Sequence, residues 1–167
     1  MKRSIKILSC ILVVICLFSF SEKDNLSKRK YEIKIIPSFV APCKIEITTE
    51  NGSGNLKFTR YKFNYDTTKV DFIKTFKLTK NEMELFSKRV SEIDWTNLKD
   101  KRKSNMDGLL VYAKYAENGM ANNFQFDSPS QNNDYNKILR CFVELSKQKV
   151  RNKKYVDYFS KLNYIER

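Results

Sequence analysis

The residue types that can do chemistry are few in this chain. Its 167 residues include no histidine, so the commonest general base, proton shuttle and metal ligand is missing. Serine–histidine mechanisms, cysteine–histidine mechanisms and zinc sites built on imidazole are thereby excluded. The sequence also has no dinucleotide fingerprint, phosphate loop or calcium loop. We therefore expect no cofactor, no metal site and no catalytic residue of these classes, and predict that the protein is not an enzyme.

Carboxylates are the remaining candidates for catalysis. Two acids that flank a scissile bond suffice for glycoside hydrolysis. Asp94, Asp107, Asp127 and Glu144 lie near apolar runs or near the ends of expected elements. None of them belongs to a catalytic motif, and aspartate at such positions is typical of turns and helix caps. A hydrolase that uses carboxylates alone therefore stays an alternative to the main interpretation.

Cys43 and Cys141 are the two cysteines outside the N-terminal segment. Each falls on the apolar side of its expected element, the first in a strand and the second in a helix. One interpretation is a disulfide, which stabilises by ~2–4 kcal/mol when it closes a long loop without strain. The other is a pair of unpaired, buried thiols that pack as small hydrophobic groups.

The first 21 residues have the pattern of a secretory signal peptide. Lys2, Arg3 and Lys6 are basic, an apolar run covers 7–20, and cleavage is expected after Ser21. The pattern predicts an exported protein that is periplasmic, associated with the cell envelope, or secreted.

This leader has two alternative interpretations. In a lipoprotein, Cys16 would carry the lipid, although the bulky Ile15 before it does not suit acylation. An uncleaved leader would be a membrane anchor, but its apolar run is shorter than the ~20 residues that cross a bilayer. The charged stretch 22–30 indicates a tether, and 31–167 is expected to form a single domain.

The clearest local structure is a β-hairpin within 107–126. Two strand-like runs flank Asn118-Gly119, whose residues tolerate positive φ. Earlier in the chain, alternating apolar residues predict strands near 31–35, 43–48 and 55–65, and 70–78 is apolar enough for another strand although its period is unclear. We interpret the first of these as a short edge strand before Pro37, and we expect a bulge near Thr59-Arg60 in the third.

Helices are predicted where apolar residues recur at helical spacing. Thr79 and Glu82 form a capping-box signature before a helix at 80–93. Ser128 and Gln131 form a second such signature before a helix that reaches about Lys149, and aromatic residues at 155–162 predict a last helix.

These elements predict an α+β fold, with an antiparallel β-sheet, helices packed mainly on one face, and the rough order β-β-β-α-β-β-α-α. The architecture is similar to that of small exported α+β modules, including inhibitor domains that bind hydrolases across an antiparallel sheet. This likeness is one of architecture and transfers no residue.

The charge of the chain indicates the kind of partner. Lys and Arg number 32 against 19 acids, a formal net charge of +13. Such a surface favours an anionic envelope component or an acidic protein, while export makes nucleic acid an unexpected partner. Membrane contact is expected only through a lipid or an uncleaved leader. Two basic segments are the expected contacts, and their residues are Lys101, Arg102, Lys103, Arg151, Lys153 and Lys154.

The main functional expectation is an exported, non-catalytic protein that binds an anionic or acidic partner. Its binding would weaken as salt is added, because exposed charges are screened. An inhibitor or immunity-type protein that blocks an enzyme's cleft is the alternative within the binding class, and its tight one-to-one complex would depend little on salt.

Overall fold

The structure, a computed structural model, describes residues 28–38, 40–63, 69–102, 108–128, 130, 132–151, 155, 158–159 and 162. This part of the chain has an α+β fold with a six-stranded antiparallel sheet and two helices. In chain order the elements are β1 (Arg29–Pro37), β2 (Cys43–Glu50), β3 (Ser53–Tyr61), β4 (Val70–Leu78), α2 (Lys80–Ser91), β5 (Leu109–Glu117), β6 (Met120–Ser128) and α3 (Asn133–Lys149).

The element order differs from the predicted one. Four strands precede α2, one more than in the predicted order, and the fourth is the apolar segment 70–78, where another strand was expected. β1 begins at Arg29, inside the stretch 22–30 that the sequence indicates as a tether. Of the last predicted helix, only Tyr155, Tyr158, Phe159 and Leu162 are described, and all four are buried.

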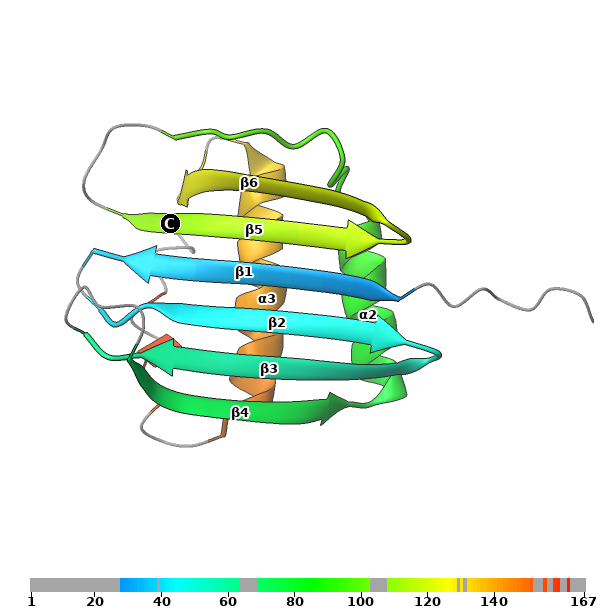
Figure 1. Cartoon of the computed structure of the whole chain (residues 1–167), viewed down its shortest axis with the longest axis horizontal. Coiled ribbons are helices and arrows are strands. Elements are labelled where there is room, and N and C mark those ends of the chain that lie inside the picture. The colour runs from blue at the N-terminus through cyan, green and yellow to red at the C-terminus, as the bar shows by residue number, and fades with distance from the viewer. Residues whose placement is uncertain are drawn as a thin grey trace, which may run out of the picture.

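The strands pair in the order β4-β3-β2-β1-β5-β6 (Figure 1). β1 lies inside the sheet: Ile33 pairs with Ile45 of β2 on one side and with Ala113 of β5 on the other. The prediction that the first strand lies at an edge is therefore wrong. Pro37 is compatible with an inner strand because it is the last residue of β1, where the hydrogen-bond ladder ends.

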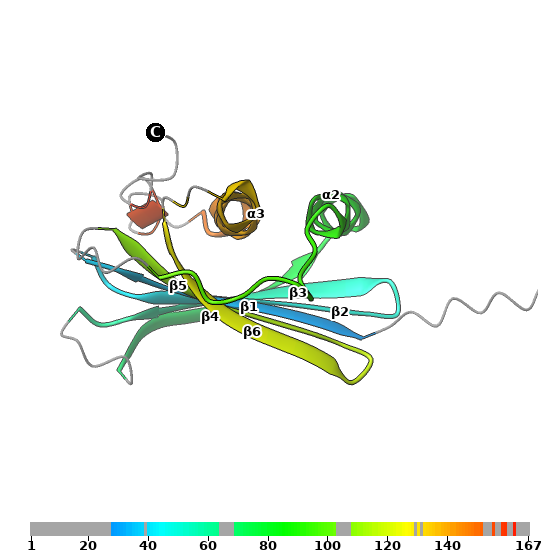
Figure 2. The same ribbon diagram turned by 90° about the horizontal axis from the view of Figure 1, so that it is seen from above.

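Helices α2 and α3 lie side by side on one face of the sheet (Figure 2). Alternate strand residues point toward them and form the core with the apolar sides of the helices. Burial of this apolar surface is the main force that holds the two layers together. The largest fully buried side chains are Phe58, Phe126, Phe142, Phe159, Ile33, Ile35, Ile45, Ile47, Leu56, Ile138, Leu139 and Leu162.

The start of α2 is as predicted. The Thr79 hydroxyl accepts from the Glu82 amide at 3.3 Å, and the Glu82 carboxylate accepts from the Thr79 amide at 2.7 Å. The predicted cap of α3 is wrong, because Ser128 is still paired with Leu109 in the sheet, and Asn132 caps the helix instead. Neither helix of the described part is long and apolar enough to cross a membrane.

Two hairpin turns fix the sheet register locally. Asn118 and Gly119 both have positive φ, at 48° and 83°, so the predicted turn between β5 and β6 is confirmed. Asn51 and Gly52 have φ of 49° and 72° and join β2 to β3 in the same way. The expected bulge is also present, as a register shift between Arg60 and Tyr61 in the β3–β4 pairing.

Candidate functional site

The predicted basic contacts do not form one site. Lys101 and Arg102 are exposed beside β6, and the Lys101 backbone pairs with that strand. Arg151 is exposed just after α3, whose C-terminal end lies over the opposite side of the sheet (Figure 1). Lys103, Lys153, Lys154 and the lipidation candidate Cys16 lie outside the described residues. The structure thus places the two described parts of these segments at opposite sides of the sheet.

Of the candidate carboxylates in the described part of the chain, Asp94 and Glu144 have structural partners. Asp94 accepts from the Thr96 hydroxyl at 2.7 Å and from the Asn97 amide at 2.6 Å, and these bonds lower the pKa of this exposed carboxyl. Glu144 pairs with Arg89 of α2. Asp127 lies in β6, and Asp107 is outside the described residues. Among the described residues, no group of three or more cysteine, aspartate and glutamate side chains is arranged to hold a metal ion.

Cys43 and Cys141 are free and buried in the structure. The Cys43 thiol contacts the Tyr158 hydroxyl, and burial raises its pKa to about 12. Cys141 lies between α3 and α2 near Arg89, and burial raises its pKa to about 11. The structure therefore does not join them in a disulfide, which was one of the two interpretations. Their different surroundings match the alternative interpretation, two thiols that pack as small hydrophobic groups.

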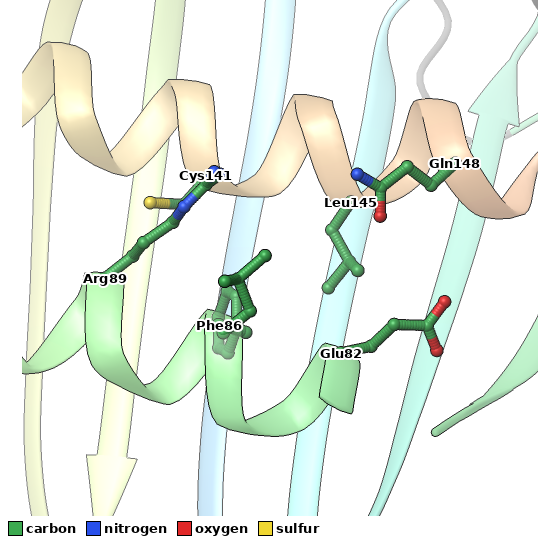
Figure 3. Close-up of a pocket in the computed structure, with 7 residues that line it drawn as sticks. Glu82, Phe86, Arg89, Cys141, Leu145 and Gln148 are labelled. Carbon is green, nitrogen blue, oxygen red and sulfur yellow. The ribbon is translucent and has the colours of Figure 1, made fainter. Parts of the chain in front are cut away.

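The groove between the two helices is too small for a ligand. Phe86 of α2 and Leu145 of α3 fill it, with Glu82, Arg89 and Cys141 around them (Figure 3). The remaining cavity has a volume of about 20 Å³, close to the space that one water molecule needs. This groove is therefore part of the packing between the helices.

A larger cleft of about 260 Å³ lies where β1 and β5 meet the end of α2. Among its polar residues, Arg29 and Glu117 form an ion pair, and the Tyr115 hydroxyl donates to Glu117. The other polar residues that line it are Ser87, Ser91, Asp94 and Thr96. Burial and this hydrogen bond raise the pKa of Tyr115. The buried rings of Tyr31 and Trp95 close the bottom of the cleft. Because Glu117 is already held by two groups of its own sheet, this arrangement joins β1 to β5.

The face of the sheet away from the helices carries a regular array of charges, which we call the uncovered face. Strand register places three rows of its residues across all six strands, and the row Ile36, Leu110 and Asp127 continues this face in β1, β5 and β6. From β4 to β6 the rows are Lys77, Asn55, Thr48, Lys30, Ala116 and Ala121; then Thr75, Lys57, Glu46, Glu32, Lys114 and Asn123; then Ile73, Thr59, Lys44, Lys34, Tyr112 and Gln125.

The two glutamates at the centre of this array are held by lysines. The ammonium groups of Lys44, Lys57 and Lys30 lie 3.1, 3.5 and 3.6 Å from the Glu46 carboxylate. Glu32 lies 3.7 Å from Lys30 and 4.0 Å from Lys44. Burial alone raises the pKa of Glu46, but the hydrogen bond and charge of Lys44 and the charges of Lys57 and Lys30 outweigh it, so the pKa is lowered.

The array leaves three lysines beyond this central network. Lys77 and Lys114 are exposed and have no ion pair with any described residue. Lys34 lies over the ring of Tyr61, 5.8 Å from its centroid. Beside it in the same row, Tyr112 is 38% exposed. The uncovered face therefore combines net positive charge with exposed aromatic surface.

Sequence reasoning missed this array, although part of its signal was visible. The alternation of Lys30, Glu32 and Lys34 with buried residues marks one polar side of β1, and Lys44 and Glu46 do the same in β2. Which strands lie next to each other decides whether these residues meet. That order depends on the pairing of β1 with β5, which is distant in sequence.

No model of a known protein family and no curated protein matches this chain. The functional argument therefore depends on the chain's own residues.

Proposed function

We propose that this protein is a non-catalytic binding protein that docks an acidic protein partner on the uncovered face of its sheet. The observation that supports this most directly is the charge of the three rows. They contain six lysines, namely Lys30, Lys34, Lys44, Lys57, Lys77 and Lys114, against the two glutamates Glu32 and Glu46. Both helices pack on the opposite face (Figure 2), and the exposed fractions of the Lys30, Lys57 and Lys44 side chains are 50%, 42% and 25%.

The central network supports binding because it holds its lysines in place. A free lysine loses ~1.5–2 kcal/mol of side-chain entropy when a partner immobilises it. Lys30, Lys44 and Lys57 already have restricted positions, since each contacts Glu46. Their ammonium groups keep further hydrogen-bond donors for a partner's carboxylates. Ordering costs at this part of the face are therefore reduced before the partner arrives.

The mixed character of the face favours a protein over a uniform polyanion. Protein interfaces combine aromatic side chains with a charged rim. Tyr112 and the Tyr61 ring both lie beside Lys34, and Ile36 and Leu110, which form the next pair along β1 and β5, are half-buried. The acids among the lysines also interrupt the positive surface that a polymer of uniform charge would follow. An acidic protein with some apolar surface is the partner that matches both features.

The location is part of this proposal. The first 21 residues predict export, and residues 1–27 lie outside the described part of the chain. The expected partner is therefore an acidic protein of the cell envelope or the exterior. If that partner is an enzyme whose activity falls on binding, the protein is an inhibitor, the alternative that the sequence left open.

Site-specific photo-crosslinking in the native host tests the proposal. A photoreactive amino acid replaces Tyr112 on the uncovered face or, as the control, Leu85 on α2, which is 51% exposed. The expected result is an acidic protein joined at position 112 and absent from position 85. Mixing the purified pair must then give a saturable complex that weakens as salt rises. Equal crosslinking at both positions, or a partner without acidic surface, would refute the proposal.

A further inference from the structure

The two edge strands of the sheet, β6 and β4, differ in whether another described segment pairs with their outer side. At the β6 edge, the Lys101 amide donates to the Gln125 carbonyl at 2.8 Å, and the Asp127 amide donates to the Lys101 carbonyl at 3.3 Å. The Asp100 carboxylate accepts from the Gln125 amide at 2.9 Å. Segment 98–102 thus follows β6 and shields it, as Figure 1 shows. At the other edge, β4 makes strand pairings only with β3 among the described residues.

β4 has the properties of an edge that can accept another strand. It is nine residues long and contains neither proline nor glycine, so every backbone N–H is present. Alternate N–H and C=O groups of an edge strand point away from the sheet. Val70 and Ile73 are 44% and 54% exposed. Exposed apolar side chains beside unpaired backbone are an interaction surface.

The charges on β4 select the partner. Lys74 and Lys77 are exposed, and neither has an ion pair with a described residue. Asp71 is bound by Arg60 at 2.8 Å, so its charge is compensated. In an antiparallel pair of two copies centred on Lys74 or on Lys77, that lysine would lie directly opposite the same lysine of the other copy. Like charges directly opposite in a sheet are destabilising, whereas glutamates or aspartates at those positions are favourable.

We propose that β4 is a docking edge, on which an extended acidic segment of another protein adds as a further antiparallel strand. Main-chain hydrogen bonds to β4 supply the affinity, and carboxylates opposite Lys74 and Lys77 supply the specificity. This site rests on the open edge and its two lysines. It does not depend on docking at the uncovered face.

The test uses the purified protein and two nine-residue peptides. Both alternate valine and threonine, and one has two glutamates three residues apart, the spacing of Lys74 and Lys77, where the other has lysines. The readout is amide hydrogen exchange across Val70–Leu78. The glutamate peptide should slow exchange at alternate β4 amides and bind at least ~10-fold more tightly than the lysine peptide, a difference of about 1.4 kcal/mol. The double variant K74E/K77E should reverse this preference.

Three results would overturn the proposal. The first is unchanged exchange in β4 with the glutamate peptide, and the second is equal protection by both peptides. The third is concentration-dependent protection of β4 without any peptide, which would assign the edge to a second copy of the chain. The variant K34E/K114E, on the uncovered face, should leave the peptide result unchanged, so failure here is distinguishable from failure of the proposed function.

Discussion

Replacing Glu46 by glutamine removes the centre of the charge array while keeping the size of the side chain. Three ammonium groups lie within 3.6 Å of this carboxylate, whose side chain is only 12% exposed. An exposed ion pair contributes ~0.2–1 kcal/mol. Without the negative charge, Lys30, Lys44 and Lys57 also repel one another. We expect E46Q to lose about 1–2 kcal/mol of unfolding free energy at neutral pH, from pair energies of that size.

The pH dependence of the stability difference between the native protein and E46Q tests whether the negative charge of Glu46 is its cause. The pKa of Glu46 is lowered in the folded protein, so the unfolded chain takes up a proton at higher pH than the folded chain does. Stabilisation by Glu46 is therefore complete above its unfolded pKa of ~4.3 and is lost as pH falls through the folded pKa. The stability difference between the native protein and E46Q should shrink when both are measured at about pH 3, where acid protonates carboxylates.

Urea unfolding followed by circular dichroism measures both effects. The matched control is E84Q, because Glu84 is 64% exposed and forms an ion pair at 3.8 Å with Lys80 of the same helix. Such a pair contributes ~0.3–0.5 kcal/mol, so E84Q should change stability by no more than that. An equal loss in both variants would refute the central role of Glu46, and so would a loss for E46Q that persists undiminished in acid.

The remaining predictions concern the cap, the core and the thiols. Thr79→Ala should lower the unfolding free energy by ~1 kcal/mol because α2 loses its capping box, whereas Thr79→Ser should retain most of it; equal losses would contradict the cap's role. Ile33→Ala should lower the unfolding free energy by ~2–5 kcal/mol, since the Ile33 side chain is fully buried. Ile36→Ala on the uncovered face should lower it by less than half as much, because Ile36 is only half-buried. Comparable losses in urea unfolding would mean that this face is covered. Cys43 and Cys141 should resist alkylation at pH 8 until the protein is unfolded, because burial raises the pKa of each thiol, and intact mass should show both thiols free; a mass lower by two hydrogens would show a disulfide.

Local features of the fold could be predicted because neighbouring residues determine them. Asn118-Gly119 tolerates the positive φ that its turn requires, and Thr79 lies three residues before the glutamate that completes its cap. The predictions were wrong where pairing with a strand far along the chain decides the structure. Ser128 has the signature of a helix cap, but pairing with Leu109 keeps it in β6. β1 resembles an edge strand until its second neighbour, β5, is known to come from far along the chain.

The sequence predicted the basic character of the candidate site but not the residues that form it. Net charge indicated a basic contact surface, but the clusters chosen from sequence runs were those with adjacent basic residues, such as Lys101 and Arg102. The lysines of the uncovered face are not adjacent in the sequence, since Lys30 and Lys34 of β1 are four residues apart, and they come together across strands, as Lys34 and Lys44 do. Adjacent basic residues in the sequence therefore do not locate this surface, because the strand register decides which lysines lie together.

The most direct test of the proposed function is the affinity of the protein for the partner that crosslinks at position 112. The variant K34E/K114E reverses two charges on the uncovered face, and K88E/R140E reverses two exposed charges on the helices as a matched control. Both should fold, as judged by circular dichroism. We expect K34E/K114E to raise Kd by at least ~10-fold and to reduce its dependence on salt, while the control stays near the native value. Equal weakening by both variants, or no weakening by K34E/K114E, would contradict docking on this face.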